Sequence, residues 1–289
     1  MIFATDLANP EGPVLLSDGS WVLVEMHPDR GWVARVSKDG KKKEVLAKTG
    51  RPNGLALDRN GVLWVAESIN PPSLLRMTLD GKYETVLTGC DGEPFLFPND
   101  LCFGPHGELY MTDSGADYRK IGHLPTKERL RIEYDGRLYR IDTETMEIKK
   151  IDSGLKFTNG IAFGPDSYLY INESRSGDVF RYKWEDGQLT GEKEFFANVM
   201  LPGGPDVFKG PDGMAFDKDG NLYVTVFVQA DVTVLAPDGS VLKRMPLVGT
   251  RPTNAAFGPD GEHKLYITDQ DIGQMEVYDV GIDGLPLYG

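Results

Sequence analysis

The sequence predicts an all-β protein, a ring of six similar four-stranded units, and three observations support this prediction. A short motif recurs six times: an apolar run, a turn rich in Asp, Gly and Pro, and a second apolar run. Most copies are followed by a second hairpin pattern. No segment has the pattern of a helix longer than one or two turns. Units of four antiparallel strands, repeated six times, are typical of a six-bladed β-propeller.

The six copies are spaced roughly 40 to 60 residues apart, which is the length of a propeller blade. They begin at Glu11, Asn53, Asn99, Asn159, Asp212 and Thr253. The two apolar runs of each copy are expected to form the first two strands of a blade, because short apolar runs between turn residues are typical of buried strands. Second hairpins are visible in stretches such as "LLRMTLDGKYETVL" and "VTVLAPDGSVLKRM".

The last copy has few residues left for its outer strands. We therefore expect residues 2–7, "IFATDL", to supply the outermost strand of that blade and to join the two ends of the chain. Residues 1–289 are expected to form a single domain. An all-β sandwich is the alternative fold, but it does not account for six equivalent hairpins.

The composition restricts the partners of this protein. The net charge is −13, which disfavours binding to nucleic acid or to an anionic membrane and suits a protein that holds a cation. No signal-peptide pattern and no long apolar run is visible, so we expect a cytoplasmic protein. Cys90 and Cys102 are expected to be buried or half-buried thiols, although a disulfide between them is also compatible with the sequence. The sequence does not predict an oligomeric state.

The residues that begin the six copies predict a cation site. The first strand of each propeller blade lies nearest the central axis, so these residues form a ring at one mouth of the channel. Every member of the ring carries a side-chain oxygen. Calcium takes six to eight oxygen ligands, and the carboxylates of Glu11 and Asp212 would balance its charge. Zinc would require His or Cys. Calcium is therefore expected first, with magnesium or manganese as alternatives.

A purely structural interpretation of the same positions is also open. Asn-Gly and Asp-Gly pairs are common in turns, because Asn and Asp tolerate the left-handed backbone conformation. Glu11 fits this interpretation poorly, since Glu is a weak turn former.

The segment that follows the second strand of each copy is expected to lie over the ring. In the third copy this segment, residues 112–134, is long, and we interpret it as a lid or a wall of the substrate site rather than a mobile insertion.

The sequence resembles the family of senescence-marker protein, regucalcin and gluconolactonase, whose more distant relatives include diisopropyl fluorophosphatase and the paraoxonases. The resemblance depends on "EGP" at 11–13, "RPNGLALD" at 51–58, "FPNDLCFGPHGELYMTD" at 97–113, "TNGIAFGPD" at 158–166 and "PDGMAFDKDGNLYVT" at 211–225. It implies a six-bladed propeller with one divalent cation, usually calcium, at the channel mouth. The family's metal ligands match Glu11, Asn99, Asn159 and Asp212.

The sequence departs from that family at one substrate position. Sugar lactonases of the family carry an Arg two residues before the third-blade Asn, whereas this chain carries Phe97 two residues before Asn99. This difference argues against gluconolactone itself and favours a less polar or differently substituted lactone. The histidine pair of the paraoxonases has no clear counterpart in this chain.

These observations predict a metal-dependent hydrolase that opens a small lactone. The cation would polarise the carbonyl while a carboxylate accepts a proton from the attacking water. Asp212 is the expected base, with Asp100 as the alternative. Phe97, Asn99 and Asp113 are expected to contact substrate, although Asp113 is equally compatible with a surface carboxylate. A phosphotriesterase with the same site and a calcium-binding or interaction propeller without catalysis are the alternative functions.

Overall fold

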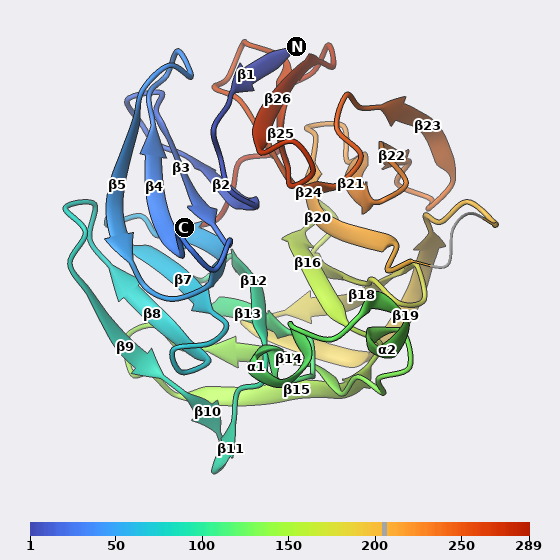
Figure 1. The fold of residues 1–289 in the computed structure, drawn as a ribbon. Helices are drawn as coiled ribbons and strands as arrows, with labels where there is room; N and C mark the ends of the chain where they lie inside the picture. The colour runs from blue at the N-terminus through green and yellow to red at the C-terminus, as the bar shows by residue number, and fades with distance from the viewer. Residues whose placement is uncertain (204–206) are drawn as a thin grey trace.

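Six antiparallel sheets of four strands surround a central axis in the computed structural model, which describes residues 1–203 and 207–289 (Figure 1). Blade 1 comprises β2 (Pro10–Leu15), β3 (Trp21–Glu25), β4 (Trp32–Val36) and β5 (Lys43–Lys48). Blade 2 comprises β6 (Pro52–Leu57), β7 (Leu63–Glu67), β8 (Ser73–Met77) and β9 (Tyr83–Leu87). Blade 3 comprises β12 (Pro98–Phe103), β13 (Leu109–Asp113), β14 (Gly136–Ile141) and β15 (Ile148–Leu155).

The other three blades repeat this arrangement. Blade 4 comprises β16 (Thr158–Phe163), β17 (Tyr168–Glu173), β18 (Asp178–Glu185) and β19 (Gln188–Asn198). Blade 5 comprises β20 (Gly210–Phe216), β21 (Leu222–Phe227), β22 (Asp231–Leu235) and β23 (Val241–Pro246). Blade 6 comprises β24 (Pro252–Phe257), β25 (Lys264–Asp269), β26 (Gln274–Asp279) and β1 (Ile2–Ala4). The predicted six-bladed propeller is therefore confirmed.

The two ends of the chain meet in blade 6. Strand β1 pairs antiparallel with β26 as the outermost strand of that sheet, as the sequence predicted. At the inner edge, the Thr253 hydroxyl donates a hydrogen bond to the Pro10 carbonyl at 2.7 Å, which links the first strand of blade 6 to that of blade 1. The ring is thus closed both by strand pairing and by a contact between its first and last blades.

The connection between β13 and β14 is long, also as predicted. It carries two short helices, α1 (Tyr118–Ile121) and α2 (Thr126–Arg129). A small additional hairpin of β10 (Gly89–Cys90) and β11 (Glu93–Pro94) precedes blade 3. Cys90 is buried and Cys102 is half-buried, and both are free thiols, so the expectation of unpaired cysteines is confirmed.

The core is divided into six apolar clusters, and each cluster contains residues from two neighbouring blades. Between blades 2 and 3, for example, Trp64 and Met111 belong to the same cluster and are almost fully buried. Burial of this apolar surface is the main term that stabilises the ring. Because every blade packs on both neighbours, the inner strands are held at fixed positions around the axis.

Each first strand carries an irregularity at the mouth of the channel. In all six blades, the register between the first and second strands shifts within the first few residues of the first strand, as between Glu11 and Val14 in blade 1. A β-bulge bends the strand and redirects a side chain. The residues that begin the six repeats lie at these bulges. The repeated backbone geometry therefore places a different side chain from each blade at the same mouth of the channel.

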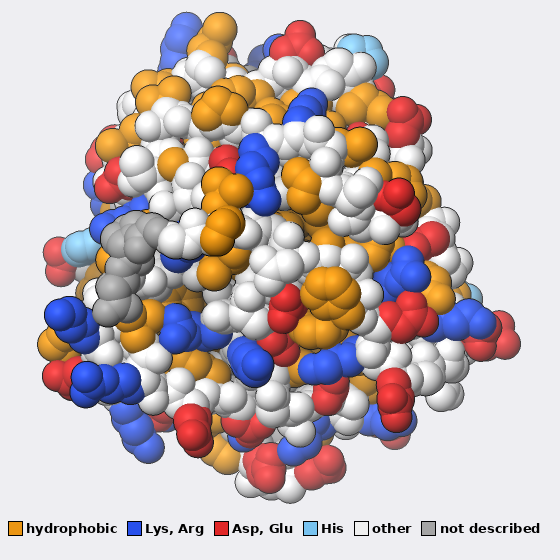
Figure 2. All heavy atoms as spheres, turned by 90° about the vertical axis from the view of Figure 1, so that its right-hand side faces the viewer, with side chains coloured by type: hydrophobic (Ala, Val, Ile, Leu, Met, Phe, Trp, Pro, Cys, Tyr) orange, Lys and Arg blue, Asp and Glu red, His pale blue; other side chains and the backbone are white. Residues whose placement is uncertain are grey.

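Charged side chains of both signs are interspersed over the outer edge of the ring that faces the viewer in Figure 2. No helix among the described residues has the length and apolar character needed to cross a membrane.

Candidate active site

The residues expected to bind a cation lie in the inner layer of the ring. Glu11, Asn99 and Asn159 are buried and Asp212 is half-buried, each near the start of the first strand of its blade. The strands that carry them, β2, β12, β16 and β20, surround the axis in Figure 1. The four side chains therefore come from the inner strands of four different blades.

Two serines orient the asparagine side chains. Asn99 Nδ2 donates to Ser114 Oγ at 2.8 Å, and Asn159 Nδ2 donates to Ser174 Oγ at 3.0 Å. Ser174 in turn donates to the Pro211 carbonyl at 2.7 Å, so it connects two blades. With the nitrogen held outward, the amide oxygen is left for the channel. Asn159 Oδ1 is buried and has no hydrogen-bond partner among the described residues.

Three carboxylates of the site influence one another. Burial raises the pKa of Glu11 well above its usual value, and the charges of Asp100 and Asp212 raise it further. Burial also raises the pKa of Asp212, together with the charge of Asp100. Burial raises the pKa of Asp100 to about 7. Each of these acids makes it less favourable for the others to be charged. A bound cation would offset this electrostatic repulsion.

Asn254 lies at the centre of this cluster and was not identified from the sequence. Its Nδ2 lies 3.3 Å from Glu11 Oε2 and 3.3 Å from Asp100 Oδ2, so it donates to acids from blades 1 and 3 while it belongs to blade 6. The inner strands contact one another in chain order around the ring, so blades 3 and 6 are opposite and Asn254 and Asp100 meet across the channel axis. Together with Glu11 they form a polar layer across the channel.

A sequence signal for this layer exists. The residue after the ring position is Gly12, Gly54, Gly160 or Gly213 in four blades, whereas blades 3 and 6 carry Asp100 and Asn254 there. Two of these glycines are required by space: a side chain at Gly54 would collide with Asp100, and one at Gly213 with Asn254. Asp100 and Asn254 therefore occupy the space beside Gly54 and Gly213.

The residues present fit a hard divalent cation. The buried Asn159 oxygen without a partner and the cluster of mutually repelling carboxylates are both explained by a positive ion at the mouth. Among residues 1–203 and 207–289, no group of three or more His, Cys, Asp or Glu side chains could hold a metal alone. The expected ligands are carboxylate and amide oxygens, which calcium prefers and zinc does not.

Phe97 lies in an aromatic wall beside this ring. It is buried and packs against Tyr118 of α1, with ring centroids 5.1 Å apart. Tyr118 belongs to the long connection between β13 and β14, so that connection contributes to the wall of the mouth. The contact joins the long connection to the segment that enters β12.

The expectation for Asp113 must be revised, both as a substrate contact and as a surface carboxylate. Its side chain is fully buried and accepts hydrogen bonds from the backbone N–H groups of Leu96, Phe97 and Gly115 at 2.8, 3.0 and 2.9 Å. Glu67 makes equivalent bonds at the end of β7. These acids fasten the segment that enters the first strand to the end of the second strand, which is a structural role.

We expect Asp113→Ala to lower the free energy of unfolding by about 2–4 kcal/mol, because it leaves three buried N–H groups without acceptors. Urea unfolding measures this loss. Asp29→Ala removes an acid that is 90% exposed and serves as the control, with an expected change within about 0.5 kcal/mol. A stable Asp113→Ala protein with a raised KM would instead return Asp113 to the substrate site.

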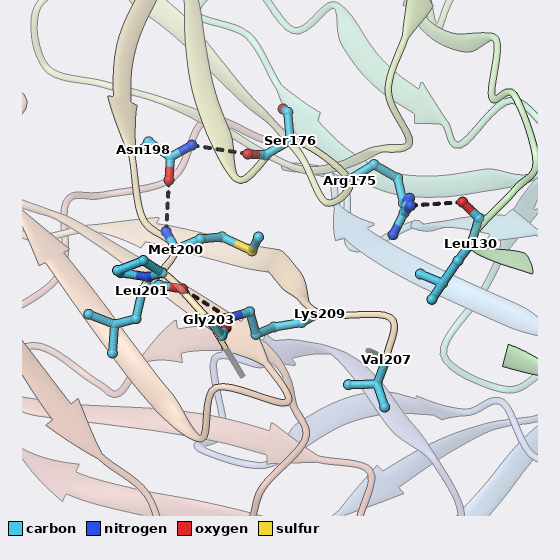
Figure 3. Close-up of a pocket in the computed structure, with 10 residues that line it drawn as sticks. Leu130, Arg175, Ser176, Asn198, Met200, Leu201, Gly203, Val207 and Lys209 are labelled. Atoms are coloured by element: carbon cyan, nitrogen blue, oxygen red, sulfur yellow. Dashed lines mark hydrogen bonds between the residues drawn. The ribbon is translucent and has the colours of Figure 1, made fainter. Parts of the chain in front are cut away.

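Two hollows adjoin the ring. One, of about 600 Å³, is lined by Leu130 and by residues between β17 and β20. Figure 3 shows Arg175 and Lys209 beside it, each donating to backbone carbonyls. The other, of about 550 Å³, continues down the channel from Asp100 and Asn254 and is covered by residues 284–289. The polar layer therefore separates the mouth from the rest of the channel.

The chain is similar to known proteins in sequence and in fold. The model of a family described as SMP-30/Gluconolactonase/LRE-like region matches residues 9–270. A gluconolactonase of Zymomonas mobilis is 26% identical over 278 residues, covering 90% of this chain and 76% of the relative. The diisopropyl-fluorophosphatase of Loligo vulgaris is 25% identical over 285 residues, covering 92% and 87%. The structure of regucalcin from Agrobacterium tumefaciens, described as a calcium-binding protein, superposes with a TM-score of 0.78 at 18% identity, covering 100% and 96%.

Proposed function

Since this chain belongs to the SMP-30/Gluconolactonase/LRE-like family, we propose that it is a metal-dependent hydrolase that opens a small lactone. The observation that carries the proposal is the cluster of Glu11, Asp212 and oriented asparagine oxygens at one mouth of the channel. Family membership supports a hydrolase in general terms. The ring-opening reaction and the metal requirement are our inference from the site.

Glu11, Asn99, Asn159 and Asp212 would hold the cation, with calcium the first choice and magnesium or manganese the alternatives. When bound, a divalent cation polarises a carbonyl and stabilises negative charge that develops on its oxygen. The serines behind Asn99 and Asn159 keep the amide oxygens turned toward the channel, so the donor set is preorganised.

Asp212 is our choice for the general base. It is half-buried at the mouth, whereas Asp100 is buried and bonded to Asn254 in the polar layer. A base must reach the water that attacks the substrate, and Asp212 is the more accessible of the two acids. Its carboxylate would accept the proton of that water.

A panel of neutral and substituted lactones, followed by proton release with and without a chelator, tests this function. We expect turnover of at least one lactone class, and we expect it to disappear when the metal is removed. Turnover that survives complete metal removal would contradict the proposed role of the cation. Absence of turnover across the panel would contradict the lactonase itself.

The same protein samples can distinguish two alternative functions from the lactonase. A phosphotriesterase with this site would hydrolyse aryl phosphotriesters or fluorophosphates faster than lactones, and the relative described as a diisopropyl-fluorophosphatase gives this alternative its basis. A binding propeller without catalysis would bind calcium and be stabilised by it, yet it would hydrolyse neither class.

A further inference from the structure

Arg51 is a buried guanidinium at the mouth of the channel, just before β6 of blade 2. Its side chain is 9% exposed. Among the described residues no carboxylate lies within the 4 Å of an ion pair, and its one side-chain hydrogen bond runs from Nη1 to Ser68 Oγ at 3.4 Å. A guanidinium carries five N–H donors, so most of them are left for another partner. A buried cation without a counter-charge is costly, and a bound anion would remove that cost.

Stacking on aromatic rings does not compensate for the burial of the Arg51 charge. The guanidinium carbon lies 3.9 Å from the ring centroid of Tyr118 and 5.2 Å from that of Phe97. Such cation–π contacts use the face of the guanidinium and stabilise the charge modestly. The N–H donors lie in the plane of the group, where they match the two oxygens of a carboxylate. The aromatic rings therefore hold Arg51 in one orientation and leave its donor edge open.

Arg51 is directed toward the reaction site. In blades 3 and 4, the serine that follows the second strand accepts from the ring asparagine, whereas in blade 2 the equivalent Ser68 accepts from Arg51. Arg51 stands two residues before the ring position Asn53, as Phe97 stands two residues before Asn99. The guanidinium stacks on Phe97, which places it beside the mouth of the channel.

The surface next to Arg51 is aromatic. Phe97 packs on Phe157, and Phe157 contacts Tyr134 and Phe208, with ring centroids 5.8, 4.9 and 4.9 Å apart. Phe208 and Tyr118 are half-buried, so part of this wall is accessible. Flat apolar rings bind well against such surfaces. Sugar hydroxyl groups would find few hydrogen-bond partners there.

We propose that Arg51 binds a carboxylate of the substrate, and that the substrate is a lactone carrying this carboxylate next to a flat apolar ring. The proposal rests on the lactonase function proposed above and specifies its substrate class. Arg175 and Lys209 add positive charge on the same face, but both donate to backbone carbonyls, at 3.0 Å to Leu130 and 3.0 Å to Leu201. They can attract an anion toward the mouth. Arg51 is the most buried of the three, so it would gain most from a bound anion.

The test compares two lactones that differ only in charge, phthalide-3-carboxylate and phthalide-3-carboxamide. We expect the native protein to favour the carboxylate by about 10–100-fold in kcat/KM, the range of one charge-assisted hydrogen-bonded pair. In Arg51→Gln this ratio should fall toward one, mainly through a raised KM for the carboxylate, and Arg51→Lys should recover part of it. Arg251→Gln is the matched control, because Arg251 also stands two residues before a ring position but is exposed.

Binding of the lactam 3-oxoisoindoline-1-carboxylate, measured by calorimetry on the calcium-loaded protein, separates this inference from the lactonase. Binding that depends on Arg51 supports the anion site even if neither lactone is opened. Equal turnover of both lactones, unchanged in Arg51→Gln, overturns the inference while the lactonase stands. If the protein neither binds the lactam nor opens either lactone, the assignment of Arg51 is overturned as well.

Discussion

Replacing Asp212 by Asn is expected to reduce kcat by about 10²–10⁴-fold, which is the usual contribution of a positioned general base. Asn keeps an oxygen toward the channel but cannot accept the proton. The measurement is kcat at saturating lactone and saturating calcium, with calcium binding to the variant confirmed by the shift of its melting temperature. This confirmation is necessary because Asp212 is also a proposed ligand, and a lost metal would mimic a lost base.

Two further variants complete this experiment. Asp219→Asn makes the same chemical change in blade 5 at an exposed turn, and we expect near-native kcat from it. Asp100→Asn changes the alternative base, which lies in the polar layer with Asn254. A large loss in Asp100→Asn beside a near-native, calcium-loaded Asp212→Asn would assign the proton transfer to Asp100.

The repeat was sufficient to predict the architecture. A propeller places equivalent residues of each copy at equivalent positions, so one alignment of the six motifs fixed the blades, the inner strands and the ring. Closure of blade 6 by residues near the N-terminus followed from counting the strands left after Thr253. The pairing of β1 with β26 confirms this predicted closure, which depended only on the repeat.

What the sequence did not predict depends on contacts between different blades. Asn254 acts by reaching Glu11 and Asp100, and no local pattern shows that blades 6, 1 and 3 meet on the axis. Asp113 was misjudged because its three N–H partners lie in the segment before β12 and just after β13, and a motif does not show hydrogen bonds. Arg51 stands in one copy of the repeated motif, "RPNGLALD", and its lack of an acidic partner among residues 1–203 and 207–289 is visible only in three dimensions.

Removal of the metal is expected to abolish activity and to destabilise the protein in a pH-dependent way. The Lewis-acid contribution of a cation is worth several kcal/mol, so chelation should lower kcat/KM by at least about 100-fold. Calcium at about 100 times its Kd should stabilise the fold by about 2.7 kcal/mol. For a chain of this size, that stabilisation corresponds to a rise in melting temperature of about 4–5 °C.

The sign of the pH effect follows from the raised pKa values of the three acids. In the metal-free fold Asp100 has a pKa of about 7 instead of 3.8, and the pKa values of Glu11 and Asp212 are raised as well. The folded state therefore holds protons that the unfolded chain releases. Its stability is highest below the unfolded pKa values and falls as pH rises toward 7 and above. Calcium replaces those protons, so the stabilisation by calcium should increase with pH.

Scanning calorimetry with excess chelator and with excess calcium, at about pH 5 and about pH 8, measures both effects. Glu11→Gln removes one of the repelling charges, so its metal-free form should lose less stability on going to high pH and should gain less from calcium. Glu192→Gln, an exposed change of the same kind, should behave as the native protein. If calcium shifted the melting temperature equally at both pH values, or not at all, the three acids would not form the cation site.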